Sequence, residues 1–244
     1  MFDDYFEVFL ADTEEGKEKH FNLRYQVYCE EMGFEDKDAF PSEMEKDEWD
    51  NQSAHFIVRL KHTKQWVGAM RLVHKTEKPL PIQVHCDIDG TDDNTQSLAE
   101  VSRLCLLKQI RKNPHQSFAI PNDDIQETDK VKLFFSHSRI NRSIIWGLLR
   151  AATIYSKQNN IKNWYFLTSK ALARVISKSG FIMNRVGEAC YHRGERFPFM
   201  MRIGDLLSQA ENIPASDIAL KDYNIGYRLY SELEAPSYAK TATA

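Results

Sequence analysis

Two apolar segments of this 244-residue chain enclose charged side chains, and these charges restrict the folds that the chain can adopt. Ala99–Leu107 contains Glu100 and Arg103, and the run VGAMRLV contains Arg71. A charge inside a strand is costly unless it is paired or hydrogen-bonded. We therefore expect the central strands of a sheet to border a charged site, with a partner for each of these side chains.

Strand-like and helix-like patterns alternate along the chain. The expected strands are Asp4–Leu10, His55–Lys61, Trp66–His74, Ala99–Leu107, Asn163–Leu167, Phe181–Val186 and Cys190–Ile203. Helical spacing follows Thr13 as far as Gly33, runs from Ser138 or Asn141 to Gln158, and covers Lys170–Lys178 after a cap at Thr168 or Ser169. This order predicts an α/β (α+β) fold with a mixed sheet flanked by helices.

The chain shows no internal repeat and no low-complexity linker, which favours one domain over residues 1–204 and a C-terminal helical extension and tail over residues 205–244. No apolar run is long enough for a transmembrane segment, and the acidic N-terminus is unlike a signal peptide. We expect a cytoplasmic protein.

The cysteine and histidine patterns carry no recognisable site. Cys29, Cys86, Cys105 and Cys190 have no CxxC or Cys/His ligand spacing, which favours reduced thiols. The eight histidines form no HExxH pattern, so no metal is indicated. Cys105 lies near Glu100, but no histidine is identifiable as its base, and a core thiol is the preferred interpretation.

Charge is unevenly distributed, although the net charge is only -3. Residues 1–50 hold 17 acidic and 5 basic residues, whereas residues 51–244 hold 18 acidic and 27 basic residues. The segment Val131–Lys157 contains no acidic residue. No nucleic-acid motif accompanies this charge. It is either a solvated basic surface or, as we favour, a site for a phosphate-bearing ligand or an acidic protein.

The segment Glu100-Val101-Ser102-Arg103 is the first candidate for chemistry. Regular strand alternation puts Glu100 and Ser102 on one face and Arg103 on the other. A β-bulge would turn both charges toward one cleft, and bulges are frequent beside active sites. The alternative, an Arg–Glu pair at a strand end, has comparable weight.

Two further arginines and an acidic cluster complete the candidate set. Arg24 lies on the apolar side of its helix, which indicates a buried or substrate-facing guanidinium. Asp47 and Asp50 precede the predicted hairpin and are expected either to hold an amine or to pair with Arg71. With no nucleophilic serine or cysteine motif, the set favours direct transfer, using a base for an amine and positive groups for a carboxylate or oxyanion.

Together these segments resemble the autoinducer-synthase branch of the GNAT acyltransferases. The matching pieces are Arg24-x-x-Val27-Tyr28-x-Glu30-x-x-Gly33-Phe34, Asp47-x-x-Asp50, Gly68-x-x-Arg71-Leu72 and Glu100-x-Ser102-Arg103-Leu104. The later residues Tyr191-His192, Gly194, Arg196 and Pro198-Phe199 are similar to N-acyl amino acid synthases, and most of all to exosortase (PEP-CTERM system)-associated acyltransferases.

The resemblance implies a mostly antiparallel GNAT-like sheet and transfer of an acyl chain from a thioester to an amine. Glu100 and Arg103 are the implied catalytic residues, with Glu100 accepting the amine proton. The implied substrate-binding residues are Arg24, Phe34, Trp49, Asp47, Asp50, Arg71 and Ser102. Backbone N–H groups of Leu104, Cys105 and Leu106 are expected to stabilise the oxyanion, and no covalent enzyme intermediate is required.

The implied donor is acyl carrier protein, whose acidic surface suits the basic part of the chain. Its expected docking residues are Lys132, Arg139, Arg142, Ser143 and Arg150. The GNAT phosphate loop normally contains glycines before the long helix, and Ser138–Ser143 has none, which weakens coenzyme A as donor. No tightly bound cofactor, nucleic acid or membrane partner is expected.

Three other functions stay open from the sequence. One is a lactone-forming autoinducer synthase using S-adenosylmethionine, and another is a coenzyme A-dependent N-acetyltransferase. The third is a non-catalytic module that binds an acyl chain or its carrier.

Overall fold

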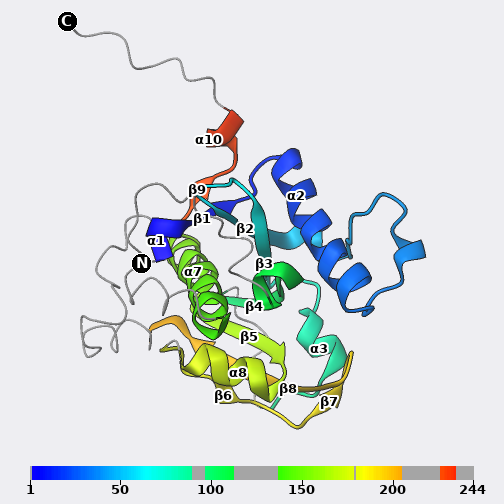
Figure 1. The fold of residues 1–244 in the computed structure, drawn as a ribbon. Coiled ribbons are helices and arrows are strands. Elements are labelled where there is room, and N and C mark those ends of the chain that lie inside the picture. Colours follow the sequence, from blue (N-terminus) through cyan, green and yellow to red (C-terminus); the bar gives the residue numbers. More distant parts are fainter. Residues whose placement is uncertain (1, 90–96, 113–136, 179, 205–225, 235–244) are drawn as a thin grey trace, which may run out of the picture.

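The computed structural model describes residues 2–89, 97–112, 137–178, 180–204 and 226–234. A twisted sheet runs through the molecule, with helices on both sides (Figure 1). No helix within these ranges is long and apolar enough to cross a membrane.

The sheet is mixed and mostly antiparallel, which confirms the predicted fold class. Its strands are β1 (Phe6–Leu10), β2 (Ser53–Leu60), β3 (Trp66–His74), β4 (Leu98–Leu106), β5 (Asn163–Thr168), β6 (Asn184–Arg185), β7 (Cys190–Tyr191), β8 (Glu195–Arg202) and β9 (Arg228–Leu229). They lie in the order β6-β8-β5-β4-β3-β2-β1-β9, and β7 pairs with β8. The parallel neighbours are β4 with β5 and β1 with β9.

The helical segments begin and end close to their sequence signals. They are α1 (Phe2–Tyr5), α2 (Glu14–Tyr25) with its π-helical continuation η1 (Gln26–Glu31), the 3-10 turns η2 (Lys37–Ala39) and η3 (Asp50–Gln52), α3 (Pro81–His85), α4 (Lys108–Lys112), α7 (His137–Gln158), α8 (Lys170–Ser177) and α10 (Ser231–Glu234). Two predicted caps are confirmed, because the Thr13 hydroxyl accepts from the Gly16 N–H at 3.1 Å and the Ser169 hydroxyl accepts from the Leu172 N–H at 3.3 Å. The cap predicted at Ser138 or Asn141 is wrong, because α7 already begins at His137.

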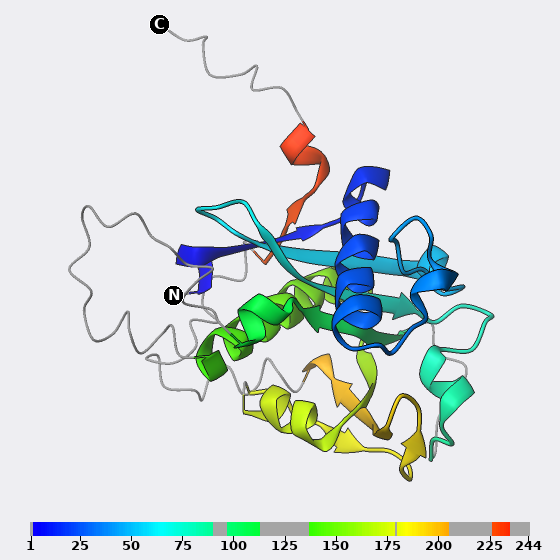
Figure 2. The same cartoon turned by 45° about the vertical axis from the view of Figure 1, so that its right-hand side comes forward.

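Strand alternation gives the sheet two apolar faces, and a helix covers each (Figure 2). Leu23 and Val27 of the α2–η1 helix pack on Phe9, Ile57 and Ala69. The opposite face packs on α7, with an apolar cluster that includes Phe6, Val8, Phe56, Met70, Ile144, Leu148 and Ala152. Because both helices bury one stripe, the central strands are buried on both sides.

The predicted bulge is present in β4. Cys105 pairs with Ala69 and Ser102 pairs with Arg71, so β4 advances three residues while β3 advances two. Arg103 is the extra residue and adopts a left-handed backbone with φ 49°. The bulge turns Arg103 toward the face that already carries Glu100 and Ser102.

The strands β4 and β5 separate just before the bulge. Their parallel pairing begins at Leu98–Asn163 and ends at Val101–Phe166, although β4 continues to Leu106 and β5 to Thr168. The end of β4 therefore has no β5 partner in this register, and the sheet opens at its centre.

Part of the predicted C-terminal extension joins the sheet. Arg228 and Leu229 form β9 beside β1, and the Ser231 hydroxyl donates to Asp12 at 2.5 Å. Residues 205–225 and 235–244 lie outside the described ranges, so the division at residue 204 stays a prediction.

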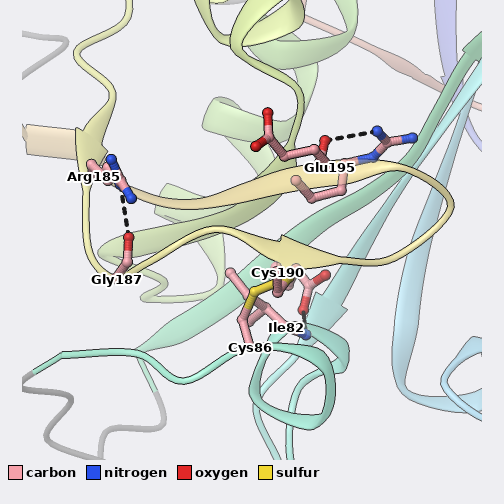
Figure 3. The surroundings of a disulfide bond; sticks show 8 residues. Ile82, Cys86, Arg185, Gly187, Cys190 and Glu195 are labelled. Atoms are coloured by element: carbon pink, nitrogen blue, oxygen red, sulfur yellow. Dashed lines mark hydrogen bonds between the residues drawn. A yellow bond between two sulfur atoms is a disulfide. The ribbon is translucent and has the colours of Figure 1, made fainter.

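The expectation of four reduced thiols is wrong for two of them. Cys86, just after α3, and Cys190 of β7 form a disulfide with a Cα–Cα distance of 5.7 Å, whereas Cys29 and Cys105 are free and buried. Figure 3 shows the bond joining the α3 turn to the β7 strand. The two cysteines are 104 residues apart, so no local spacing could reveal the pair. Disulfides are rare in the reducing cytosol, which counts against the cytoplasmic expectation.

Reducing this disulfide should destabilise the protein, because opening a loop of this length returns conformational freedom to the unfolded chain. We expect a loss of about 2–4 kcal/mol in the free energy of unfolding, measured by urea unfolding with and without reductant. The matched control is the double variant Cys86→Ser/Cys190→Ser, which should not respond to reductant. Four titratable thiols in the unfolded, untreated protein would contradict the assignment.

Candidate active site

A cavity of about 780 Å³ lies where β4 and β5 separate. Its walls come from the end of the α2–η1 helix, the acidic loop before β2, α3, the α7 and α8 helices, and the turn between β7 and β8. One part of the wall is charged and the other is apolar. The charged part gathers most of the residues that the sequence singled out.

Arg24 anchors a buried ion network behind this wall. Its side chain is fully buried, and its guanidinium donates to the carboxylates of Glu45 and Asp50, the latter at 2.6 Å. Neither Arg24 nor Asp50 is among the residues that line the cavity. Protein charges already surround both residues, which hold the acidic loop against the sheet, and their predicted role in substrate binding stays a prediction.

Arg71 has the partners that its place in an apolar strand requires. Its Nη1 donates to Asp47 at 2.5 Å and to Asp50 at 2.9 Å, and its Nε donates to the Ser102 hydroxyl at 3.1 Å. Asp47 and Asp50 thus pair with Arg71, which was one of the two roles predicted for them. Arg71, Asp47 and Ser102 all line the cavity.

Arg103 is turned by the bulge into the same network. Its Nη2 lies 3.1 Å from Glu45 and 3.0 Å from Asp47, and its guanidinium carbon lies 5.7 Å from the centre of the Tyr28 ring. Glu45 was missed by the sequence analysis because it lies in a loop rich in acidic residues that are otherwise solvated. Only its 1% exposure and its two arginine partners distinguish it.

The network keeps its acids ionised. Burial would raise the pKa of Glu45, but Arg24 and Arg103 outweigh it and lower the pKa to about 2. Burial acts in the same way on Asp50, where His55, Arg24 and Arg71 hold the pKa well below its usual range. Three arginines and three carboxylates thus neutralise one another in the wall.

Glu100 has the opposite environment, although it lies only three residues before Arg103. Its side chain is 3% exposed and lines the cavity, and Oε2 accepts a hydrogen bond from the Ile82 N–H of α3 at 2.7 Å. Burial raises the pKa of Glu100 to about 8, although the Ile82 N–H, Arg71 and Arg103 act in the lowering direction. A carboxyl group with a pKa near neutrality suits proton transfer.

Leu104, Cys105 and Leu106 form the cavity wall along the unpaired end of β4. The Leu104 carbonyl accepts from the Tyr28 hydroxyl at 3.3 Å. Burial raises the pKa of the Cys105 thiol to about 12, so it stays protonated, in keeping with a core thiol rather than a nucleophile. The oxyanion role of these backbone groups stays a prediction.

Phe34 and Trp49 both line the cavity. Phe34 is 40% exposed, and the Trp49 indole donates to the Pro79 carbonyl at 3.1 Å. Their predicted place in the cavity wall agrees with the structure.

The β7–β8 hairpin adds residues to the site to which the sequence gave no role; His192 and Arg196 belong to the matched family pattern, whereas Arg193 does not. His192, Arg193 and Arg196 line the cavity, together with His85 of α3. The rings of His85 and His192 stack with their centres 3.9 Å apart. Among the described residues, no group of three or more His, Cys, Asp or Glu side chains is placed to hold a metal ion.

The residues predicted to dock a carrier separate into three groups. Arg142 lines the cavity, whereas Arg139 is exposed outside it and Ser143 is partly buried beyond the lining. Arg150 is buried, donates to Asp3 at 2.8 Å and lies 4.6 Å from the Trp146 ring centre, contacts that give it a structural role, and its docking role stays a prediction. Lys132 lies outside the described residues.

The apolar part of the cavity lies between β4, β5 and the helices α7 and α8. Its lining includes Val101, Leu104, Ile145, Phe166, Leu172, Val175 and Ile176. This apolar wall can enclose a hydrocarbon chain, and the charged wall can bind a polar group. Glu100 and Arg103 belong to the same cavity as both walls.

Comparison with known proteins agrees with this geometry. Residues 23–120, which include Arg24, the acidic loop, Arg71 and all of β4, match the family model described as acetyltransferase (GNAT) domain. The match covers less than half of the chain, and the mixed, mostly antiparallel sheet is consistent with the GNAT fold. No curated protein matches the sequence.

Solved structures share the fold of the GNAT domain and extend the similarity over most of the chain. LasI, an AHL synthase, has 17% identity and a TM-score of 0.54 over 81% of this chain and 90% of its own. BjaI with MTA, a CoA-dependent acyl-homoserine lactone synthase, has 15% identity and a TM-score of 0.57 over 85% and 88%. TofI with an inhibitor and MTA has 16% identity and a TM-score of 0.56 over 86% and 98%.

Replacing Glu45 with glutamine should destabilise the protein, because it leaves Arg24 and Arg103 buried with fewer negative partners. Breaking a buried ion pair on one side costs about 3–5 kcal/mol. Urea unfolding of Glu45→Gln measures the loss. The matched control is Glu48→Gln in the same loop, where the side chain is 64% exposed and its ion pair with Lys78 is at 4.0 Å, so little change is expected. Equal stability of the two variants would contradict the network's role.

Proposed function

We propose that the protein is an N-acyltransferase that moves a fatty acyl chain from an acyl carrier protein thioester to the amine of an amino acid or a similar small acceptor. The observation that carries the proposal is the position of Glu100. It is a buried carboxyl group with a raised pKa, between an apolar wall and a charged wall of one cavity.

In the proposed reaction, Glu100 accepts a proton from the attacking amine, directly or through water. The amine nitrogen forms a bond to the thioester carbonyl carbon, and backbone N–H groups of 104–106 stabilise the negative charge on the oxygen. The C–S bond then breaks, and the proton held by Glu100 neutralises the thiolate. Arg103 holds the acidic loop beside Glu100, and no bond to the enzyme forms.

The donor side supports an acyl-phosphopantetheine thioester. Arg111 and Arg142 line the cavity near the beginning of α7, and Arg139 is exposed close by. An acidic carrier would be attracted to these charges, and its arm would enter the apolar wall. Similarity to exosortase-associated acyltransferases rests on residues between Tyr191 and Phe199, in the β7–β8 hairpin, and belongs to the proposal.

The second candidate is a lactone-forming autoinducer synthase. The similarity to LasI, BjaI and TofI favours it, and one BjaI structure contains SAM and isopentyl-CoA. That BjaI is CoA-dependent also keeps coenzyme A open as a donor. Incubation of the protein with acyl carrier thioester or acyl-CoA, and with amino acids or S-adenosylmethionine, separates these functions by mass spectrometry of the product. A protein that only binds acyl chains would give no product.

Replacing Glu100 with glutamine should lower the turnover number about 10²–10⁴-fold, because a general base is lost. In the wild type, kcat/KM should rise with pH and level off above about 8, since Glu100 must lose its proton first. The measurement uses an acceptor whose amine is unprotonated throughout the pH range, so that only the enzyme titrates. Glu100→Gln should lack the rising limb. A variant with unchanged rate and pH profile would remove Glu100 from the base role.

Reversing Arg139 and Arg142 to glutamate should raise the KM for acyl carrier thioester, because both charges are placed to attract the acidic carrier. The effect should weaken as salt is added, since screening acts over about 8 Å at 0.15 M. A short thioester without a carrier should show little change. The matched control is Arg174→Glu, an exposed arginine of α8 outside the cavity lining. An equal response of both donors would argue against docking at this surface.

A further inference from the structure

Arg193, in the turn between β7 and β8, lines the cavity but takes no part in the proposed acyl transfer. We propose that Arg193 selects an acceptor amine that also carries a carboxylate, and so discriminates against neutral and cationic amines. This inference rests on the proposed acyl transfer and names the class of acceptor for that same cavity.

The charge of the cavity wall is the first support. Among the described residues, the lining has seven basic side chains and four acidic ones. The basic residues are Lys46, Arg71, Arg103, Arg111, Arg142, Arg193 and Arg196, and the acidic ones are Glu35, Glu45, Asp47 and Glu100. Such a wall attracts an anion and repels a cationic acceptor such as a sulfonium compound.

The buried arginines have little capacity left for an acceptor carboxylate. Arg71 and Arg103 already donate to Glu45, Asp47 and Ser102. Arg71 is fully buried, and its Nη2 atom has no hydrogen-bond partner among the described residues. This Nη2 atom is itself buried, so a carboxylate of the acceptor needs a cation closer to the opening to be held in a defined orientation.

Arg193 is placed to supply that cation. It lines the cavity, its Nη1 lies 2.8 Å from His192 Nε2, and its Nη2 donates to the Glu35 carboxylate. The same Glu35 oxygen lies 3.6 Å from Arg103 Nη2. A carboxylate of the protein therefore already lies between two guanidinium groups from different elements, at the wall of the cavity. With 20% of its side chain exposed, Glu35 can give way to a carboxylate of the acceptor.

The turn that carries Arg193 is held in place by two contacts. The Cys86–Cys190 disulfide ties β7 to the end of α3, and the His85–His192 stack joins the same two segments (Figure 3 shows the disulfide). Since α3 also supplies the Ile82 N–H to Glu100, the proposed base and the proposed anion contact are supported by one covalently linked unit. This preorganisation reduces the entropy cost of holding a small acceptor.

The experiment compares three acceptors with one acyl donor: an amino acid, its carboxamide and the corresponding amine without the carboxyl group. The wild type should use the amino acid with a kcat/KM at least 10-fold higher than the other two. Arg193→Gln should raise the KM for the amino acid about 10–100-fold, the range expected for a lost charged hydrogen bond, and leave kcat and both other acceptors nearly unchanged. Rescue of the KM by Arg193→Lys would show that charge is the cause.

Two further variants test the direction of the KM change and provide a matched control. Glu35→Gln should lower the KM for the amino acid, because the competing carboxylate loses its charge. Arg185→Gln should behave as the wild type, since Arg185 lies on β6, pairs with Glu188 and is outside the cavity lining. A general loosening of the turn would raise all KM values together and move Glu35→Gln in the same direction as Arg193→Gln.

Calorimetric binding of the amino acid and its carboxamide, without donor, separates this inference from the proposed function. If the wild-type protein forms no product with any amine, the proposed acyl transfer is wrong. The selection by Arg193 is still supported in that case if the amino acid binds more tightly than its carboxamide and Arg193→Gln abolishes this difference. If product forms equally with all three acceptors, or Arg193→Gln affects them equally, the role of Arg193 is overturned while acyl transfer stands.

Discussion

The ion network of Arg24, Arg71 and Arg103 with Glu45, Asp47 and Asp50 is the interaction on which the site depends. Each charge is buried or nearly so, and each would be costly without its partners. The arginines come from the α2 helix and two strands, and the acids come from one loop. The network therefore fixes an otherwise irregular loop against the sheet and makes it a wall of the cavity.

The same strand that contributes Arg103 to this network supplies a carboxyl group with the opposite protonation behaviour. The bulge at Arg103 shifts the register, so that Arg103 meets the acidic loop while Glu100 meets α3 and a single N–H. The surroundings of Glu45 favour its ionised form, and burial of Glu100 favours its protonated form. Two carboxyl groups whose pKa values are shifted in opposite directions are expected where one group transfers protons and the other stabilises the structure.

The opening of the sheet gives the cavity its two sides. Because β4 and β5 pair only as far as Val101 and Phe166, side chains of α7 and α8 reach the space between the strands and form its apolar wall. The charged wall comes from the acidic loop, α3 and the β7–β8 turn. An acyl chain and a polar acceptor can thus enter from different sides and meet near Glu100, which is the geometry that direct transfer needs.

The sequence by itself determined the elements and the charged residues that cannot be left unpaired. Charges inside apolar strands and caps such as Thr13 and Ser169 are local signals, so Glu100, Arg71, Arg103 and the bulge could be predicted. Only the tertiary structure decided the partners: Glu45 among many loop acids, Asp3 for Arg150, Cys86 with Cys190, and Arg193 beside Glu35. These partners lie from 58 to 158 residues apart, and such pairs are set by how the strands are ordered in the sheet, which no local pattern records.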